Sequence, residues 1–161
     1  MMRWVDRAIE GLAILGVAAY AAAALVTVAD ILGRRFGLPI DGVVDIVQLC
    51  IMAGAWFVIP WAFVAGAHVS VDFVQARLPE ALGRLIEILA ALMAGALLLL
   101  MLRYGYDTAS MQRLLGDRSQ QLGIPIIWYW APQLLGQAVA VLAVISVLTR
   151  LFGYRSSEDH S

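Results

Sequence analysis

Charged side chains are scarce in this sequence, and lysine is absent. Charged residues make up 14% of the 161 residues, hydrophobic residues make up 62%, and all eleven basic residues are arginine. The mean hydropathy is +0.84. A soluble domain of this composition would have too few polar residues to cover its surface. The composition therefore indicates an integral membrane protein, and the net charge of -1 gives no indication of a nucleic-acid partner.

Cysteine and histidine are also rare, which limits the possible chemistry. Cys50 is the single cysteine, so no disulfide can form within the chain. His160 belongs to a polar tail at 154–161 that we expect to be disordered, which excludes a bis-histidine haem in the membrane. The chain contains no phosphate-binding loop, dinucleotide fingerprint or G-x-S-x-G motif. These absences predict a protein that is not an enzyme and holds no cofactor.

The other histidine lies in a polar stretch between two apolar runs. His68 and Asp72 are four residues apart, so on a helix they would share one face and could bind a metal ion or pair with each other. A zinc site would require further ligands from residues distant in the sequence. A polar cluster at a helix end requires none, and the sequence favours that interpretation.

Four long apolar runs are present, and each can cross a hydrocarbon core that needs about 20 helical residues. They predict helices at about 8–30, 42–66, 80–107 and 125–151 within a single membrane domain at 1–153. The predicted fold class is an all-α integral membrane protein with four transmembrane helices and an amphipathic segment between helices two and three. The first run also resembles a signal peptide, but Asp6 and Glu10 in its charged region favour a membrane helix.

Proline marks the expected beginnings of three helices. Pro39, Pro79 and Pro125 each precede an apolar run, and proline is tolerated in a first helical turn, where its missing N–H has no intrahelical partner. Helices two, three and four are therefore expected to begin near these prolines. Asp41 and Glu80 would then lie in first turns, where a carboxylate suits the positive end of the helix dipole.

Two further prolines, Pro60 and Pro132, lie inside the predicted helices. Each removes the hydrogen bond to the carbonyl four residues before it, at Trp56 and Trp128, so we expect a kink or a neighbouring group at these carbonyls. Small residues recur at four-residue spacing, which lets membrane helices approach closely. The pairs are Ala18 with Ala22, Ala19 with Ala23, Ala90 with Ala94, Ala91 with Gly95, and Gly136 with Ala140. The helices thus have the features of a packing subunit.

The arginine distribution does not fix the orientation in the membrane. If both termini lie on the same side, six arginines lie on that side and five on the other. Deep ionisable residues are also missing, because Asp30 and Asp45 fall at helix ends and Gln48, one turn further in, is not ionisable. A stand-alone exporter that couples protons to substrate would need a carboxylate well inside the membrane.

The order of motifs along the chain resembles the small membrane subunit of TRAP transporters, the tripartite ATP-independent periplasmic systems of the DctQ-type family. The motifs extend over nearly the whole chain, and one departure is that Ala65, Gly66 and Ala67 precede the histidine where family members often carry basic residues. In chain order the motifs are Gly33-Arg34-Arg35, Pro39, the acidic Asp45, the element His68-Val69-Ser70-Val71-Asp72, Leu78-Pro79, Leu122-Gly123-Ile124-Pro125, and Tyr129, Pro132 and Gly136 in the last helix.

This resemblance implies a non-catalytic scaffold beside a larger membrane subunit that carries the substrate and sodium sites. A periplasmic binding protein would deliver an organic acid to the pair. The resemblance further implies a bacterial inner-membrane protein embedded in the lipid bilayer, with both termini cytoplasmic. Arg34 would then lie outside and Arg77 inside.

Two groups of residues are the candidate sites. Asp45, Gln48, His68 and Asp72 are expected to form a structural joint or contact the large subunit. Charged contacts for the binding protein are expected at Arg34, Arg35, Arg113 and Arg118, although Arg34 and Arg35 could instead anchor a helix end at lipid headgroups. Two other classes stay open, a stand-alone small four-helix transporter and a membrane metal protein.

Overall fold

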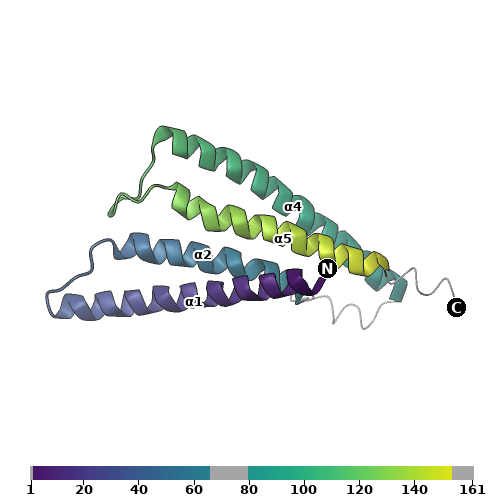
Figure 1. The fold of residues 1–161 in the computed structure, drawn as a ribbon, viewed down its shortest axis with the longest axis horizontal. Helices are drawn as coiled ribbons and strands as arrows, with labels where there is room; N and C mark the ends of the chain where they lie inside the picture. The colour runs from purple at the N-terminus through teal and green to yellow at the C-terminus, as the bar shows by residue number, and fades with distance from the viewer. Residues whose placement is uncertain (1, 66–79, 154–161) are drawn as a thin grey trace.

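The protein folds into long helices, and short loops join the first helix to the second and the last two helices to each other. The structure, a computed structural model, describes residues 2–65 and 80–153 (Figure 1). The helices are α1 (Met2–Arg35), α2 (Val43–Val64), α4 (Glu80–Leu115) and α5 (Ile127–Gly153). The predicted amphipathic segment lies outside the described residues, together with His68, Asp72, Arg77 and the tail at 154–161.

All four described helices are long and apolar enough to cross a membrane. The shortest, α2, has 22 residues and therefore extends over about 33 Å, compared with about 30 Å for a hydrocarbon core. Large apolar side chains are exposed on the described helices, including Leu25 at 70% and Met93 at 75%. Such surfaces need lipid or a protein partner to cover them. The prediction of an all-α membrane protein with four spanning helices is confirmed.

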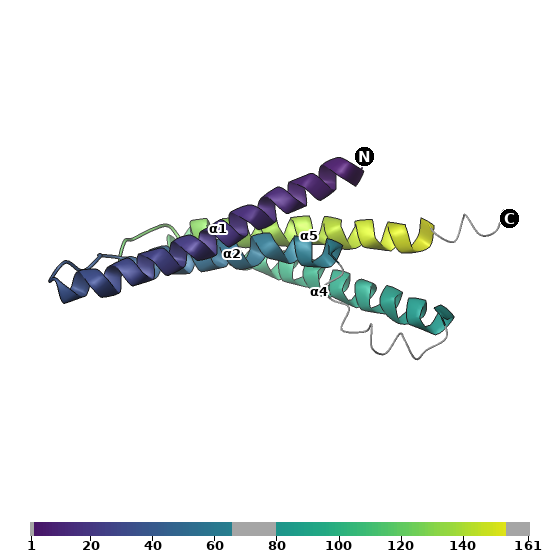
Figure 2. The ribbon, with the colours of Figure 1, turned by 90° about the horizontal axis from the view of Figure 1, so that it is seen from below.

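The helices form one twisted layer whose spatial order differs from the chain order. α1 packs against α2, α2 against α5, and α5 against α4, so α2 and α5 are central and α1 and α4 are at the edges (Figure 1). The loops at 36–42 and 116–126 lie at the same end, which we call the loop end. Because α2 and α5 both begin at the loop end, they run parallel. α1 and α4 diverge from them on opposite sides toward the other end (Figure 2).

A small apolar core lies where α2, α4 and α5 meet. Leu98 of α4 and Ala140 and Val144 of α5 are buried together, and Ile59 and Phe63 of α2 pack against them. The small side chain of Ala140, a position predicted from the small-residue spacing, is fully buried and lets the helices approach closely.

Pro60 and Gly136 together explain the contact between the two central helices. Pro60 lies inside α2 and leaves the Trp56 carbonyl without its usual helical donor. That carbonyl meets α5 at Gly136, where an added Cβ would overlap it. The predicted neighbour of the Trp56 carbonyl is therefore the backbone of α5, which can come this close only because Gly136 has no side chain.

Two helices extend further than the sequence indicated. α1 continues to Arg35 and α4 to Leu115, beyond the predicted ends at 30 and 107. In α1, Asp30 and Arg34 form an ion pair one turn apart that supports the additional turn. In α4 the helix continues until Gly116, whose φ of 72° lies outside the helical region. The end of an apolar run therefore did not mark the end of either helix.

α2 begins within one residue of the predicted start at 42, and four residues after Pro39. α2 begins at Val43, after Gly42, whose φ of 75° is left-handed and interrupts a helix. Asp41 consequently lies in a turn rather than in the first helical turn, and Asp45 is the acidic residue of that turn. α4 begins at Glu80, directly after Pro79, and α5 begins two residues after Pro125, at Ile127.

Candidate functional site

Asp45 connects α2 to the second half of the chain at the loop end. Its side chain lies in the first turn of α2, and the residue is only 4% exposed. The carboxylate oxygen Oδ2 accepts hydrogen bonds from the backbone N–H groups of Leu122, at 2.6 Å, and Gln121, at 3.1 Å. The Tyr129 hydroxyl of α5 donates to the Asp45 carbonyl at 3.1 Å. One residue thus fastens α2 to both the loop at 116–126 and α5.

Close packing accompanies these hydrogen bonds. The Leu122 side chain fills the space in front of Gly42, where any Cβ would overlap it. Glycine is therefore required at position 42 for two reasons: its backbone is left-handed, and a side chain there would occupy the space of the Leu122 side chain. The start of α2 and the tip of the loop at 116–126 fix each other's position.

The loop at 116–126 has ordered backbone geometry of its own. Residues 118 and 125 form an antiparallel bridge. The Ser119 N–H donates to the Ile124 carbonyl at 2.8 Å, and the Ile124 N–H donates to Ser119 Oγ at 2.9 Å. Arg118 Nη1 donates to the Gly123 carbonyl at 3.2 Å. These bonds satisfy the loop internally, so the loop can present side chains at fixed positions.

A polar pocket of about 310 Å³ lies between α2 and this loop. It brings together three residues that the sequence singled out: Asp45, Gln48 and Arg118. Other lining residues are Val44, Ser119, Gln120, Gln121, Ile126 and Tyr129. Asp45 is committed to the loop, whereas the Gln48 amide has no hydrogen bond to any described residue. Together with the remaining N–H groups of Arg118, it can offer donors to a carboxylate or an amide of a ligand or partner.

A second carboxylate, Asp30, fixes the loop between α1 and α2. The residue is 6% exposed, and its two oxygens accept from different groups. Arg34 Nε donates to Oδ2 at 2.7 Å, and the Ile40 N–H donates to Oδ1 at 2.9 Å. Both loops at this end are therefore held by a buried carboxylate that accepts backbone N–H groups.

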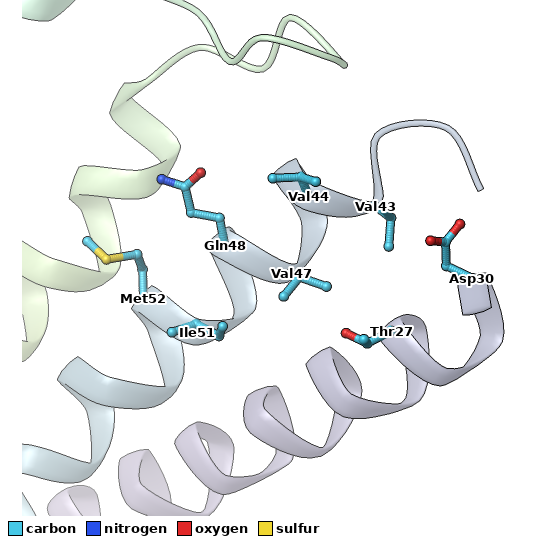
Figure 3. A pocket seen from close by; sticks show the side chains of 8 residues that line it. All are labelled: Thr27, Asp30, Val43, Val44, Val47, Gln48, Ile51 and Met52. Atoms are coloured by element: carbon cyan, nitrogen blue, oxygen red, sulfur yellow. The ribbon is translucent and has the colours of Figure 1, made fainter. Parts of the chain in front are cut away.

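An apolar groove of about 490 Å³ separates this carboxylate from the polar pocket. Figure 3 shows Val47 directed toward α1, whereas Gln48 is directed toward α5. The groove is lined by Thr27, Asp30, Val43, Val44, Val47, Gln48, Ile51 and Met52. Its lining is mostly apolar, with Asp30, Thr27 and Gln48 as the polar residues.

The four arginines proposed as docking residues all lie at or next to the loop end. Arg34 and Arg35 end α1, Arg113 lies in the last turn of α4, and Arg118 lies in the loop. All four are exposed, although Arg34 is also paired with Asp30. His68 and Asp72 lie outside the described residues. Within 2–65 and 80–153, no group of three or more histidine, cysteine, aspartate or glutamate residues could hold a metal ion.

Two site residues were not identified as such from the sequence. Asp30 was placed at a helix end, but its contact with Ile40 depends on how the loop folds back. Tyr129 was noted as a motif residue, but its bond to Asp45 joins positions 84 residues apart in the chain. Only the acidic character of Asp30 and the spacing of Tyr129 after Pro125 could have suggested either role.

The family comparison covers this site. The family model described as Tripartite ATP-independent periplasmic transporters, DctQ component, matches residues 23–153. No curated protein matches the chain. The matched residues include the last third of α1, all of α2, α4 and α5, and both loops at the loop end. The resemblance seen in the sequence is confirmed, and the chain belongs to the DctQ family, the small membrane component of TRAP transporters.

Proposed function

We propose that this chain is the non-catalytic scaffold subunit of a sodium-coupled TRAP transporter that imports an organic acid. In this proposal a large membrane subunit carries the substrate and sodium sites, and a periplasmic binding protein delivers the substrate. Membership of the DctQ family supports association with both proteins.

The single observation that carries the proposal is the fastening of the loop at 116–126 by Asp45. A scaffold must keep its contact surface fixed while its partner moves. Hydrogen bonds from Leu122 and Gln121 to a buried carboxylate hold the tip of this loop against α2. The exposed Arg118 is attached to the same loop and is therefore held at a defined position.

The loop end is proposed to face the periplasm, with both termini in the cytoplasm of a bacterial cell. The orientation can be tested with single cysteines at Arg34 and Arg77 in a Cys50→Ala background. An impermeant thiol reagent applied to intact cells should label the cysteine at position 34 and not that at position 77. Labelling at position 77 would show that the chain has the opposite orientation.

Reconstitution tests the function itself. The chain should co-purify with the large subunit in mild detergent, and sodium-dependent uptake in vesicles should require this chain, the large subunit and the binding protein. The chain alone should give no uptake. Uptake by the purified chain alone would favour a stand-alone transporter, and undiminished uptake without the chain would refute the scaffold role.

The four arginines at the loop end are proposed to steer the binding protein into register. Arginine can hold carboxylates in bidentate fashion, and exposed contacts of this kind act mainly on the association rate. Salt should weaken them, because exposed charges are screened over about 8 to 10 Å at physiological ionic strength. None of these residues needs to touch the substrate.

His68 and Asp72 are proposed to anchor the end of helix two to helix three or to the large subunit. Polar groups at a membrane helix junction must find partners. Asp72→Ala should therefore reduce assembly in detergent and leave the metal content of the purified protein unchanged. A stoichiometric ion that disappears with Asp72→Ala would instead support a metal protein.

A further inference from the structure

The outward face of α4 carries an ion pair in an unexpected place. Arg103 Nη1 contacts Asp107 Oδ1 one helical turn away, and their side chains remain 67% and 50% exposed. Gly105, between them in the sequence, is buried against α5. The pair therefore points away from the rest of the chain, and none of the described helices covers it.

The contacts between helices show the height at which this pair lies. Gly105 faces Leu134 and Trp130 of α5, so Arg103 and Asp107 lie beside the first half of that helix. The next turn of α5 contains Gly136, which meets Trp56 of α2. Trp56 and Gly136 both lie near the middle of long uncharged runs, at 46–67 and 124–149. The ion pair is thus level with the middle of these two uncharged runs.

α4 is therefore displaced along its axis relative to its neighbours. Its uncharged run, 88–102, lies beside the second half of α5, where Gly95 approaches Val144 and Leu98 packs on Ala140. The predicted helix at 80–107 has Arg103 near its end, but the packing of Gly105 against α5 places Arg103 beside the middle of the uncharged run of α5. The half of α4 nearer the loop end is consequently polar where α2 and α5 are apolar.

Gln137 provides an independent sign of polarity at this height. The residue is fully buried, and neither its Nε2 nor its Oε1 has a hydrogen-bond partner among the described residues. Its Oε1 is 3.6 Å from the position that a Cβ on Gly105 would occupy. An unpartnered amide thus lies directly behind the α4 segment that carries the ion pair.

Acyl chains are a poor environment for this face. Charged side chains in the hydrocarbon centre are costly and are normally turned toward protein or water. Around the ion pair, the large side chains Leu100, Tyr104 and Met111 are 54%, 66% and 63% exposed. A surface with an arginine, an aromatic residue and methionine has the composition that is enriched at protein interfaces.

We propose that the large membrane subunit binds to one face of α4, which is formed by Leu100, Arg103, Tyr104, Asp107 and Met111. The partner would offer polar side chains or free backbone groups to the ion pair and apolar side chains to the three surrounding residues. This inference rests on the proposed scaffold function and adds to it the edge of the layer that is used. The opposite edge, α1, carries no comparable exposed charge in the middle of its apolar run at 11–29.

Site-specific crosslinking in the assembled complex tests the assignment. A photo-crosslinking amino acid replaces Tyr104, and the matched control replaces Leu25 of α1, which is similarly exposed at 70%. Co-purification is measured in the same samples. We expect the adduct with the large subunit to be at least about tenfold stronger from position 104 than from position 25.

The outcomes separate this inference from the proposed function. If the subunits co-purify but position 104 gives no adduct, or one no stronger than position 25, the assignment to α4 is wrong and the scaffold function stands. If the subunits do not co-purify, both are refuted. Adducts of position 104 with lipid alone would show that the bilayer covers this face.

A variant series provides a second readout. Arg103→Leu and Asp107→Leu each leave one charge unpaired, and the double variant removes both. If the large subunit covers the pair, all three should lower the recovered complex, by about tenfold for the single variants and less for the double variant. If lipid covers it, the double variant should assemble as well as the unmodified chain, which would overturn the assignment.

Discussion

The contact between Gly136 and the Trp56 carbonyl gives a prediction about how the central helices pack. Gly136→Ala adds a Cβ that would overlap the carbonyl oxygen, the carbonyl carbon and the Cβ of Trp56. Two of these three atoms belong to the backbone, which cannot rotate out of the way as a side chain can. The helices must therefore separate locally, which also loosens the neighbouring core around Ala140.

The magnitude follows from two opposing terms. Overpacking a close-packed site costs about 1 to 3 kcal/mol, and a backbone obstacle places this site in the upper part of that range. Alanine in place of glycine returns up to about 1 kcal/mol through its better helix propensity. The net loss is about 1 to 2 kcal/mol, or about a 5- to 30-fold shift toward the unfolded state. At about 2 to 4 °C per kcal/mol, the midpoint should fall by about 2 to 8 °C.

Thermal unfolding in detergent, followed by the loss of the monodisperse chromatographic peak, measures this shift. Gly11→Ala is the matched control, because Gly11 is in α1 and an added Cβ there meets no atom within 4 Å. The control should be neutral or slightly stabilising. The proposed packing would be refuted if the unfolding midpoints of Gly136→Ala and Gly11→Ala differed by less than about 1 °C.

Three further predictions concern the loop end and the α4–α5 contact. Asp45→Ala should release the loop at 116–126, so that limited proteolysis near Leu122 becomes faster, whereas Asp41→Ala in the exposed turn should not change it; equal cleavage in both would contradict the fastening role. Gln137→Leu should stabilise the purified chain by about 1 to 3 kcal/mol, because it removes a buried amide without partners among the described residues. A lower unfolding temperature for Gln137→Leu than for the unmodified chain would contradict this prediction. Arg118→Glu should lower uptake at limiting binding protein, with recovery when binding protein is raised and unchanged co-purification with the large subunit; unchanged uptake across that titration would confine Arg118 to a structural role.

The four spanning helices could be predicted because long apolar runs leave few alternatives in a membrane. The ends of the helices were less predictable. Pro39 indicated only the neighbourhood in which α2 begins; the left-handed Gly42 sets the start at Val43, and a glycine's φ is not visible in the sequence. The additional turns of α1 and α4 depend on local ion pairs and on the position of the next helix-breaking glycine, so hydropathy alone ended both helices too early.

The sequence singled out three residues of the polar pocket but not their meeting. Asp45 and Gln48 were selected as polar residues near the start of a membrane helix, and Arg118 was selected as a charged residue of an outer loop. Their meeting in one pocket depends on the parallel packing of α2 and α5, which brings positions 45 and 129 together. Sequence spacing carries no information about that neighbour relation. The level of Arg103 was missed for the same reason, because it depends on how far α4 is displaced along α5, which the contacts of Gly95 and Gly105 show.

The arrangement of the four described helices in a single layer limits what the isolated chain could enclose. A permeation path through a membrane must be walled on all sides, because acyl chains provide no polar lining for a solute. A row in which α1 and α4 lie at opposite edges supplies one wall and leaves both faces open (Figure 1). Any route for a polar solute along these four described helices would therefore need further walls from outside the layer.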